Sequence, residues 1–481
     1  MSGNNPADLG IAELAPLLRR RELSASELMR ACLDRIEAAN PVLNAFVHVD
    51  AAGALHAAEA ADEAISRGGW QGPLHAIPLA VKDNYLTAGM PTTACSRVLV
   101  GNVPGADATV VARLRAAGAI VIGKTNMHEW AYGGTNEISS FGPARNPWHT
   151  EHITGGSSGG SGAALAARLV PAALGSDTGG SVRIPASACG VSGLKPTYGR
   201  VSRHGILPLS WSLDIGGPMA RSAADLAILF AAMGGADPND AASVDPPTRS
   251  FRRCPERALA GLRIAVLSDD SLATTPEVAA PVQAALRAME HAGATVEGAP
   301  LPDIDLGMST WKVIMMAEAT TFHARYLATR HADYAPGVRT QLEAGRLITG
   351  PQYLKAQQYR VEFNRTVHAL FASADVVALP TLPVPAPRIG QGRVMLNGRE
   401  ITSQDAMTYA CWIANLSGLP AISLPCGFSG DGLPIGLTLI GSADSEMRLL
   451  AIADAYEALT DWHKRAPATR PPDPKAPRHG P

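Results

Sequence analysis

The chain has few charged residues, few cysteines and no long apolar run. Charged residues make up 17% of its 481 positions and the formal net charge is −2, so the bulk electrostatics recruit neither nucleic acid nor an anionic membrane. No apolar stretch approaches the ~20 residues of a membrane span, and the N-terminal segment lacks the basic start and apolar stretch of a signal peptide. These absences predict a cytoplasmic protein with small neutral partners and with no membrane or nucleic-acid partner.

The cysteines indicate neither a metal site nor a disulfide framework. They lie far apart, without a CxxC pair and without a histidine at metal-ligand spacing. A chain of this length with 46% hydrophobic residues can bury a large core and needs no disulfide, so we expect reduced, buried thiols. The six are Cys32, Cys95, Cys189, Cys254, Cys411 and Cys426.

Changes in hydrophobic period predict the fold class. A run over residues 76–81 is too short for a helix and is typical of a buried strand, with Lys82 at its exit. A helical segment over 108–117 precedes a second buried strand at 119–122, and this alternation is typical of layered architecture. We therefore predict an α/β fold, a single α/β/α layered domain in which a large twisted mixed β-sheet is covered by helices.

The rest of the chain is divided by composition. Ser24 and Glu27 form a capping box in a helical N-terminal segment, and residues 236–257 are a Pro-, Asp- and Arg-rich surface connection. Six prolines after Ala466 predict a disordered tail. The predicted parts are a single domain over 1–466 with N-terminal helices and core at 7–235, a helical insertion shaping the pocket entrance at 263–371 and the C-terminal part of the sheet at 376–460, followed by the tail at 467–481.

Two glycine-rich loops, at residues 155–162 and 177–185, hold serines. Glycine lets backbone N–H groups converge on one point, which is how an oxyanion hole is built. Such loops also cradle phosphate, but GxxxxGK[ST] is absent and no GxGxxG stands in the required context. The four consecutive candidates for oxyanion donors are Thr178, Gly179, Gly180 and Ser181.

A serine hydroxyl needs a base, and Lys82 is the candidate. It is the one ionisable group at the end of an apolar strand, where desolvation favours the neutral amine that can accept a proton. None of the 13 histidines stands in a comparably distinctive context. The structural alternatives are a surface lysine at a strand end and Gly-Gly-Ser segments that only make turns.

Residues 80–84, 155–161 and 175–183 resemble the three defining blocks of the amidase signature family. Lys82 and Ser157 are 75 positions apart and Ser157 and Ser181 are 24 apart, in agreement with the family's arrangement. The likeness extends from the N-terminal helices to Gly441. The resemblance implies the amidase signature fold and hydrolysis of amides without a metal or an organic cofactor.

Carried over by position, the resemblance also implies roles. Ser181 attacks the amide carbonyl, Ser157 relays its proton and Lys82 is the final base; the peptide before Ser157 is cis, and an acyl-serine intermediate forms. Ser158 and Asp177 orient the loop. Arg183 holds Asp177, although a purely structural ion pair is the alternative.

The resemblance gives weaker indications for substrate binding. Ala131, Tyr132, Gly133 and Gly134 match a family segment that lines the acyl pocket, and Trp412 is a further candidate. Packing of Tyr132 in the core is the alternative. These side chains suit apolar or aromatic substrates, so amides, anilides, esters and carbamates are all open, as for an aryl acylamidase or a urethanase.

We predict a free-standing amidase that acts on a small amide with water, and leave a homodimer open. The alternative is the amidase subunit of a glutamyl-tRNA(Gln) amidotransferase, which works with partner subunits and tRNA. In that subunit an arginine and an aspartate hold glutamine, and the corresponding positions here are Arg360 and Thr408. Threonine leaves the ammonium without a counter-charge, which argues against glutamine. A third hypothesis, a non-catalytic binding module, predicts that Lys82 and Ser181 are dispensable.

Overall fold

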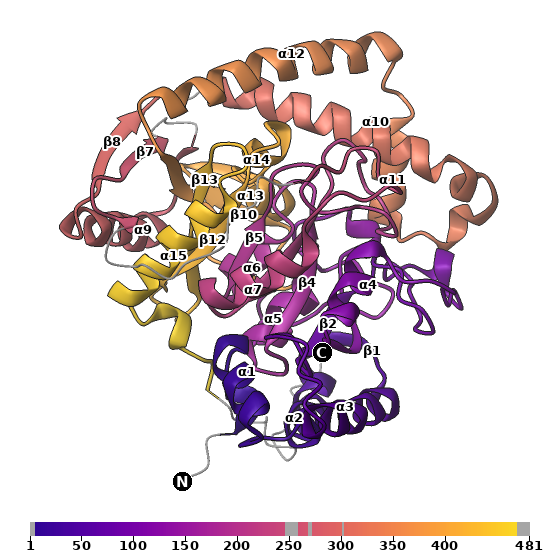
Figure 1. The fold of residues 1–481 in the computed structure, drawn as a ribbon. Helices are drawn as coiled ribbons and strands as arrows, with labels where there is room; N and C mark the ends of the chain where they lie inside the picture. The colour runs from indigo at the N-terminus through magenta and orange to yellow at the C-terminus, as the bar shows by residue number, and fades with distance from the viewer. Residues whose placement is uncertain (1–4, 246–257, 268–271, 301–302, 469–481) are drawn as a thin grey trace, which may run out of the picture.

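One mixed sheet of eleven strands runs through the described part of the chain (Figure 1). The structure, a computed structural model, describes residues 5–245, 258–267, 272–300 and 303–468. Strand order is β1-β3-β2-β4-β6-β5-β12-β13-β9-β7-β8, which confirms the predicted α/β class with a large mixed sheet. In that order the bounds are Phe46–Val49, Ile120–Thr125, Pro78–Lys82, Ala172–Asp177, Ile215–Ala220, Ser192–Lys195, Ala421–Phe428, Pro434–Gly441, Val376–Pro380, Arg263–Leu267 and Thr295–Ala299.

The two halves of the sheet contain parallel pairs, and the middle is antiparallel. β2 pairs in parallel with β3 and β4, and β7 pairs in parallel with β8 and β9. Between β4 and β9 each neighbouring pair is antiparallel. Parallel strands end at the same edge of a sheet, so Lys82 at the end of β2 lies beside the last residues of β4, where Ser176 and Asp177 are found.

Helices connect the strands and cover both faces of the sheet. A small hairpin of β10 (Arg393–Leu396) and β11 (Arg399–Thr402) stands apart from the main sheet. The α-helices are α1 (Ile11–Arg20), α2 (Ala25–Leu43), α3 (Ala51–Ser66), α4 (Thr109–Ala116), α5 (Gly159–Ala166), α6 (Arg183–Cys189), α7 (Ala223–Met233), α9 (Pro276–His291), α10 (Ile304–Arg330), α11 (Pro336–Gly345), α12 (Gly350–Ala369), α13 (Ser403–Thr408), α14 (Trp412–Leu416) and α15 (Glu446–Leu459). The 3-10 helices are η1 (Pro6–Asp8), η2 (Arg97–Leu99), η3 (Glu129–Ala131), η5 (His331–Asp333), η6 (Leu370–Ala372) and η7 (Trp462–Lys464).

Alternating side chains of the strands feed two separate cores. Along β9, Val376 and Ala378 join the core beneath α1–α7, α9 and α15, whereas Val377 and Leu379 join the core beneath α10, α11, α12 and α14. Successive strand side chains point to opposite faces, so one strand serves both cores. Figure 1 shows α10 and α12 as the outer layer at the top of the molecule.

Several boundaries of the sequence analysis can be compared with these elements. The predicted capping box begins α2: Ser24 Oγ accepts from the Glu27 N–H at 3.1 Å, and the Glu27 carboxylate accepts from the Ser24 N–H at 2.8 Å. The segment 263–371 is not purely helical, because β7 pairs with β9 and with β8, and these two strands extend the sheet before α10–α12 begin. Most of the tail predicted at 467–481 lies outside the described residues.

Two further expectations concern membrane-spanning segments and the state of the cysteines. No helix within the described ranges is long and apolar enough to cross a membrane. The cysteines in those ranges are free and buried, and Cys254 lies outside them.

Candidate active site

The Lys82 amine is enclosed at the end of β2. Its side chain is 0% exposed, and Nζ lies 2.7 Å from Ser157 Oγ, 2.8 Å from Ser176 Oγ and 3.3 Å from the Ser176 carbonyl oxygen. Burial lowers the pKa of Lys82 to about 7, against the weaker opposing influence of Asp177 and Asp214. The amine is therefore close to half neutral near pH 7.

The surroundings of Lys82 can also serve a neutral amine. A neutral lysine carries two hydrogens and one lone pair. Ser176 supplies two acceptors, its carbonyl and hydroxyl oxygens, and the hydroxyl is itself held by Asn84 Nδ2 at 3.0 Å. A neutral amine that directs both hydrogens to Ser176 has its lone pair left for the Ser157 hydroxyl 2.7 Å away, and in that arrangement it can accept a proton from Ser157.

Ser157 lies in the tight loop that enters α5. The peptide bond between Gly156 and Ser157 is cis, as the resemblance implies. Gly156 N–H donates to the Gly134 carbonyl at 2.7 Å, and a Cβ at Gly156 would lie 2.7 Å from the Asn136 nitrogen. Only glycine therefore fits in front of Ser157.

Ser181 presents a free hydroxyl at the start of α6. Its side chain is 7% exposed, and its hydroxyl bonds to no group of the described chain. Ser158 N–H donates to the Ser181 carbonyl at 3.3 Å, and this bond ties the two serine loops together. The Ser158 hydroxyl lies 3.3 Å from both the carbonyl oxygen and the backbone nitrogen of Ser176, which places Ser158 between the loops and β4.

The backbone around Ser181 supplies donors. Within the described residues the N–H groups of Thr178, Gly179 and Ser181 have no acceptor, whereas the Gly180 N–H donates to Asp177 Oδ1 at 2.7 Å. Of the four predicted oxyanion donors, Gly180 is thus occupied by a carboxylate. The other three N–H groups are free to meet a substrate oxygen.

A buried ion pair fixes this loop. Asp177 and Arg183 are both 0% exposed; Arg183 Nε and Nη2 donate to the Asp177 carboxylate at 3.1 Å, and Asn415 Nδ2 donates to it at 2.9 Å. Burial alone would raise the pKa of Asp177, but the Arg183 charge and the Asn415 amide hold it at about 2. Asp177 is therefore a permanent anion that accepts bonds from the Gly180 and Val182 N–H groups.

The predicted substrate segment at residues 131–134 lies against the Ser157 loop through the Gly134–Gly156 bond. A Cβ at Gly133 would lie 2.1 Å from the His128 ring, so only glycine fits there. The Tyr132 hydroxyl is buried without a hydrogen-bond partner in the described chain. Ala131 ends η3 and is also buried.

Trp412 is part of the core. It is 0% exposed, its ring lies 5.4 Å from that of Phe363, and its Nε1 donates to the Tyr409 carbonyl at 2.9 Å. A Cβ at Gly307 would lie 2.5 Å from the same ring. These contacts favour packing between α10 and α12 over contact with a substrate.

The two positions that the sequence resemblance matches to glutamine-binding residues, Arg360 and Thr408, differ in their surroundings. Arg360 donates from Nε to the Leu416 carbonyl at 2.8 Å and from Nη1 and Nη2 to Ser212, so local acceptors engage all three nitrogens. Thr408 lies against the substrate segment, because a Cβ at Gly134 would be 3.2 Å from Thr408 Cγ2. Its methyl group lies against that segment, and its hydroxyl donates to the Gln404 carbonyl at 3.2 Å, so no carboxylate is offered there.

The sequence analysis missed several residues of this site. Asn84 and Ser176 stand inside the family blocks but received no role. Asp214, Trp311 and Asn415 reach Thr178 or Asp177 from distant parts of the chain, and no local motif marks them. In the described part of the chain, no three His, Cys, Asp or Glu side chains are grouped to hold a metal ion.

Comparison with known proteins finds similarity over most of the chain. The family model described as Amidase matches residues 27–450. A glutamyl-tRNA(Gln) amidotransferase subunit of Nitrosococcus oceani is 40% identical over 95% of this chain and 99% of its own length. The same subunit of Aromatoleum aromaticum is 43% identical over 95% of this chain and 98% of its own length.

Solved structures agree in fold. A structure described as a vestigial protein complex that reveals the origins of an s-triazine catabolic enzyme matches with a TM-score of 0.89 and 36% identity, over 94% of this chain and 98% of that one. The corresponding glutamyl-tRNA(Gln) amidotransferase subunit of Thermotoga maritima matches with a TM-score of 0.79 and 35% identity, over 95% of this chain and 96% of that one. The peptide amidase of Stenotrophomonas maltophilia matches with a TM-score of 0.83 and 32% identity, over 97% of this chain and 99% of that one.

These matches correct one prediction and refine another. The expected partners, a small amide alone and no nucleic acid, are contradicted by relatives named as subunits of an amidotransferase that acts on tRNA. The near-neutral charge misled that prediction, because another subunit of a complex can carry the positive surface. The matches support an enzyme that cleaves C–N bonds, as a hydrolase or as an amidotransferase. The collinear match over nearly the full length shows that the chain belongs to the amidase family, the amidase signature enzymes.

Proposed function

We propose that this chain cleaves a carboxamide with Ser181 as nucleophile, Ser157 as proton relay and Lys82 as base. The observation that carries the proposal is the buried Lys82 amine, whose Nζ lies 2.7 Å from Ser157 Oγ and has two further oxygen acceptors on Ser176, so that a neutral amine can direct both hydrogens to Ser176 and its lone pair to Ser157. Such an amine takes a proton through Ser157 without a histidine.

The reaction divides into two displacements. Ser181 Oγ attacks the amide carbon while its proton passes to Ser157, and the proton of Ser157 passes to Lys82. The oxyanion meets the N–H groups of Thr178, Gly179 and Ser181, each typically worth a few kcal/mol to the transition state. The protonated lysine returns the proton to the leaving nitrogen, ammonia departs, and water then attacks acyl-Ser181 by the same route.

We further propose that the chain is the amide-cleaving subunit of a complex of the glutamyl-tRNA(Gln) amidotransferase type. Relatives with that name match 95% of this chain at 40% and 43% identity and are covered over 98–99% of their own lengths. Glutamine would then be the amide donor, and partner subunits would use the ammonia on tRNA.

A specific observation favours a second candidate for the amide donor. Thr408 faces the substrate segment without a carboxylate, and Arg360 already donates to Leu416 and Ser212. An α-ammonium would lack its counter-charge and an α-carboxylate would have to displace existing bonds. The second candidate is therefore a carboxamide without the α-amino acid group, consumed in a complex of the same kind.

The test measures ammonia release by the full chain, alone and with its co-expressed partner subunits. The substrates are glutamine and a matched carboxamide without the amino group, such as glutaramate, with Ser181→Ala as the blank. Ammonia from glutamine that depends on the partners supports the amidotransferase proposal. Release from glutaramate but not from glutamine favours the second candidate, and Thr408→Asp should then confer activity on glutamine. No release above the blank in any combination refutes both.

A further inference from the structure

We propose that Asp214 is a positioning residue for the oxyanion loop: it holds Thr178, and through it the N–H groups beside Ser181, in the orientation that amide attack requires. The inference deepens the proposed function and rests on it. Asp214 belongs to none of the glycine-rich loops and does not touch Lys82 or Ser157 by any hydrogen bond of the described chain.

Asp214 joins the loop to a neighbouring turn. Its Oδ1 accepts from Thr178 Oγ1 at 2.6 Å, and its Oδ2 accepts from the backbone N–H groups of Leu209 and Ser210 at 2.8 and 3.0 Å. The side chain is 6% exposed. A buried carboxylate with three donors is a rigid anchor, because releasing any donor leaves a buried polar group unpaired.

Thr178 is held from its other side by α10. Trp311 Nε1 donates to the Thr178 carbonyl at 3.0 Å, and a Cβ at Gly179 would lie 2.2 Å from the Trp311 ring. Thr178 is thus fixed at its hydroxyl by Asp214 and at its carbonyl by Trp311. These two bonds leave the N–H groups of Thr178 and Gly179 free for a substrate oxygen.

The turn that donates to Asp214, at Leu209 and Ser210, is itself hydrogen-bonded to α10. Glu318 accepts from the Ser210 hydroxyl at 2.6 Å, from the Ser212 N–H at 3.0 Å and from the Ser212 hydroxyl at 2.7 Å. Helix α10 therefore holds the oxyanion loop directly through Trp311 and indirectly through Glu318 and Asp214. Both routes converge on Thr178.

The charge of Asp214 predicts a second measurable effect, on the protonation of Lys82. The titratable groups that act on the pKa of Lys82 are Asp177 of β4, Asp214 before β6 and the loop residue Cys95, and Lys82 in turn helps to lower the pKa of His128. Burial, and to a lesser degree the neighbouring Glu318, raise the pKa of Asp214 to about 6, although its three donors oppose the shift. Above that pH Asp214 is an anion, and its charge favours the protonated form of Lys82.

The experiment follows sulfonylation of the full chain by phenylmethanesulfonyl fluoride, which transfers its sulfonyl group to a serine oxygen and releases fluoride. The sulfonyl oxygens need the same donors as an amide oxyanion, and no amide substrate has to be known. The second-order rate is measured from pH 5 to 9, and mass spectrometry locates the modified serine. In the wild type Ser181 should react, with a rate that rises to a plateau as Lys82 loses its proton.

Two variants separate positioning from charge. Asp214→Asn should lower the plateau at least ~10-fold and move the midpoint at least ~0.3 pH unit towards lower pH, because the anion that favours protonated Lys82 is gone. Thr178→Val should lower the plateau similarly but move the midpoint less than Asp214→Asn does, because the Asp214 carboxyl is still present, and Thr178→Ser should restore the rate. If the Asp214 variant does not fold, the comparison of Thr178→Val with Thr178→Ser tests the proposal.

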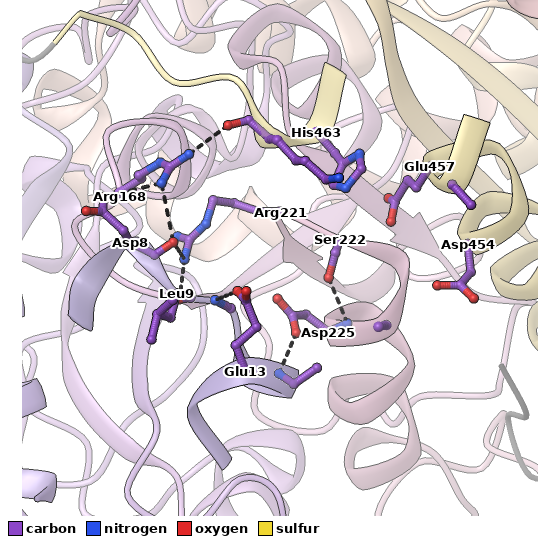
Figure 2. A pocket seen from close by; sticks show the side chains of 15 residues that line it. Asp8, Leu9, Glu13, Arg168, Arg221, Ser222, Asp225, Asp454, Glu457 and His463 are labelled. Carbon is purple, nitrogen blue, oxygen red and sulfur yellow. Dashed lines mark hydrogen bonds and ion pairs between the residues drawn. The ribbon is translucent and has the colours of Figure 1, made fainter. Parts of the chain in front are cut away.

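Asp225 supplies the matched control. It is a buried carboxylate that accepts from the Ala12 N–H at 2.8 Å, in a polar cavity of about 480 Å³ between α1, α7 and α15 (Figure 2). Figure 2 shows it pointing to the start of α1, among residues that include Arg221 and Glu457 but none of the serine loops. Asp225→Asn should change neither plateau nor midpoint.

The outcomes separate the proposed nucleophile from the role of Asp214. If Ser181→Ala is modified as fast as the wild type, the proposed nucleophile is wrong. If Ser181 reacts as expected while Asp214→Asn and Thr178→Val keep the wild-type rate and midpoint, the inference about Asp214 is wrong and the proposed function stands.

Discussion

Arg183 holds Asp177 through two hydrogen bonds of 3.1 Å at a point where neither side chain reaches solvent. Arg183→Met should lower the free energy of unfolding by ~3–5 kcal/mol, because it leaves a buried carboxylate unpaired. Urea denaturation at pH 7 measures the change. Arg20→Met, which breaks the exposed pair of Arg20 with Glu22, is the control and should change nothing measurable.

The same pair predicts a stability profile in acid. Since the pKa of Asp177 is about 2, below its ordinary 3.8, its contribution is complete above pH ~4 and is lost as the pH falls through 2. The stability gap between wild type and Arg183→Met should narrow over that window. A gap that stays constant down to pH 2 would show that Asp177 is not held as an anion by Arg183.

Ser181→Ala should abolish acyl transfer, with a loss of at least ~10³-fold in kcat, and should leave the folded state intact. The free hydroxyl makes no bond to the described chain, so its removal breaks none. Circular dichroism and ammonia release measure the two effects. Ser187→Ala, at a buried serine of α6, is the matched control and should keep its activity; equal losses in both variants would contradict the assignment.

The acid limb of kcat/KM should report Lys82. Burial lowers the pKa of Lys82 to about 7, and only the neutral amine takes the proton, so kcat/KM should fall tenfold per pH unit below that value. Lys195 is also buried with a pKa lowered to about 7, yet among the described residues it donates only to the Pro196 carbonyl. Lys195→Met should therefore leave the midpoint unchanged. A flat acid limb in the wild type would exclude Lys82 as the base.

Lys82→Met should lose activity but raise the free energy of unfolding near pH 7. Folding depresses the pKa of Lys82, so the folded state disfavours a proton that the unfolded chain binds, and this cost is full below pH ~7 and disappears above ~10.5. At pH 7 we expect the variant to gain ~1–3 kcal/mol in free energy of unfolding after the lost bonds to Ser157 and Ser176 are subtracted. Thermal unfolding at pH 7 and pH 10.5 tests it; an equal gain at both pH values would show that desolvation is not the cause.

Gly133→Ala should damage the site through packing alone. Its Cβ would lie 2.1 Å from the His128 ring, so the substrate segment or the histidine must move, at a cost of ~1–3 kcal/mol and with a higher KM. Gly350→Ala, where nothing lies within 4 Å of the new methyl group, is the control and should be neutral. Normal KM in Gly133→Ala would place residues 131–134 outside the substrate site.

The sequence by itself determined the local elements and the candidate chemistry. The apolar run before Lys82 forms β2, the capping box at Ser24 begins α2, and the three motif blocks around Lys82, Ser157 and Ser181 resemble those of the family that the chain belongs to. Strands and helix starts depend on neighbours in the chain, and family blocks are contiguous, so both are visible without coordinates.

Tertiary structure decided which groups surround those residues. Parallel pairing of β2 with β4 brings Ser176 to Lys82, and the packing of α10 and of the Asn415 helix brings Trp311 and Asn415 to the oxyanion loop. Tertiary packing also placed Trp412 in the core, against Phe363 of α12. Contacts between residues far apart in the chain leave no local pattern, because they depend on how the sheet and its helical layers assemble.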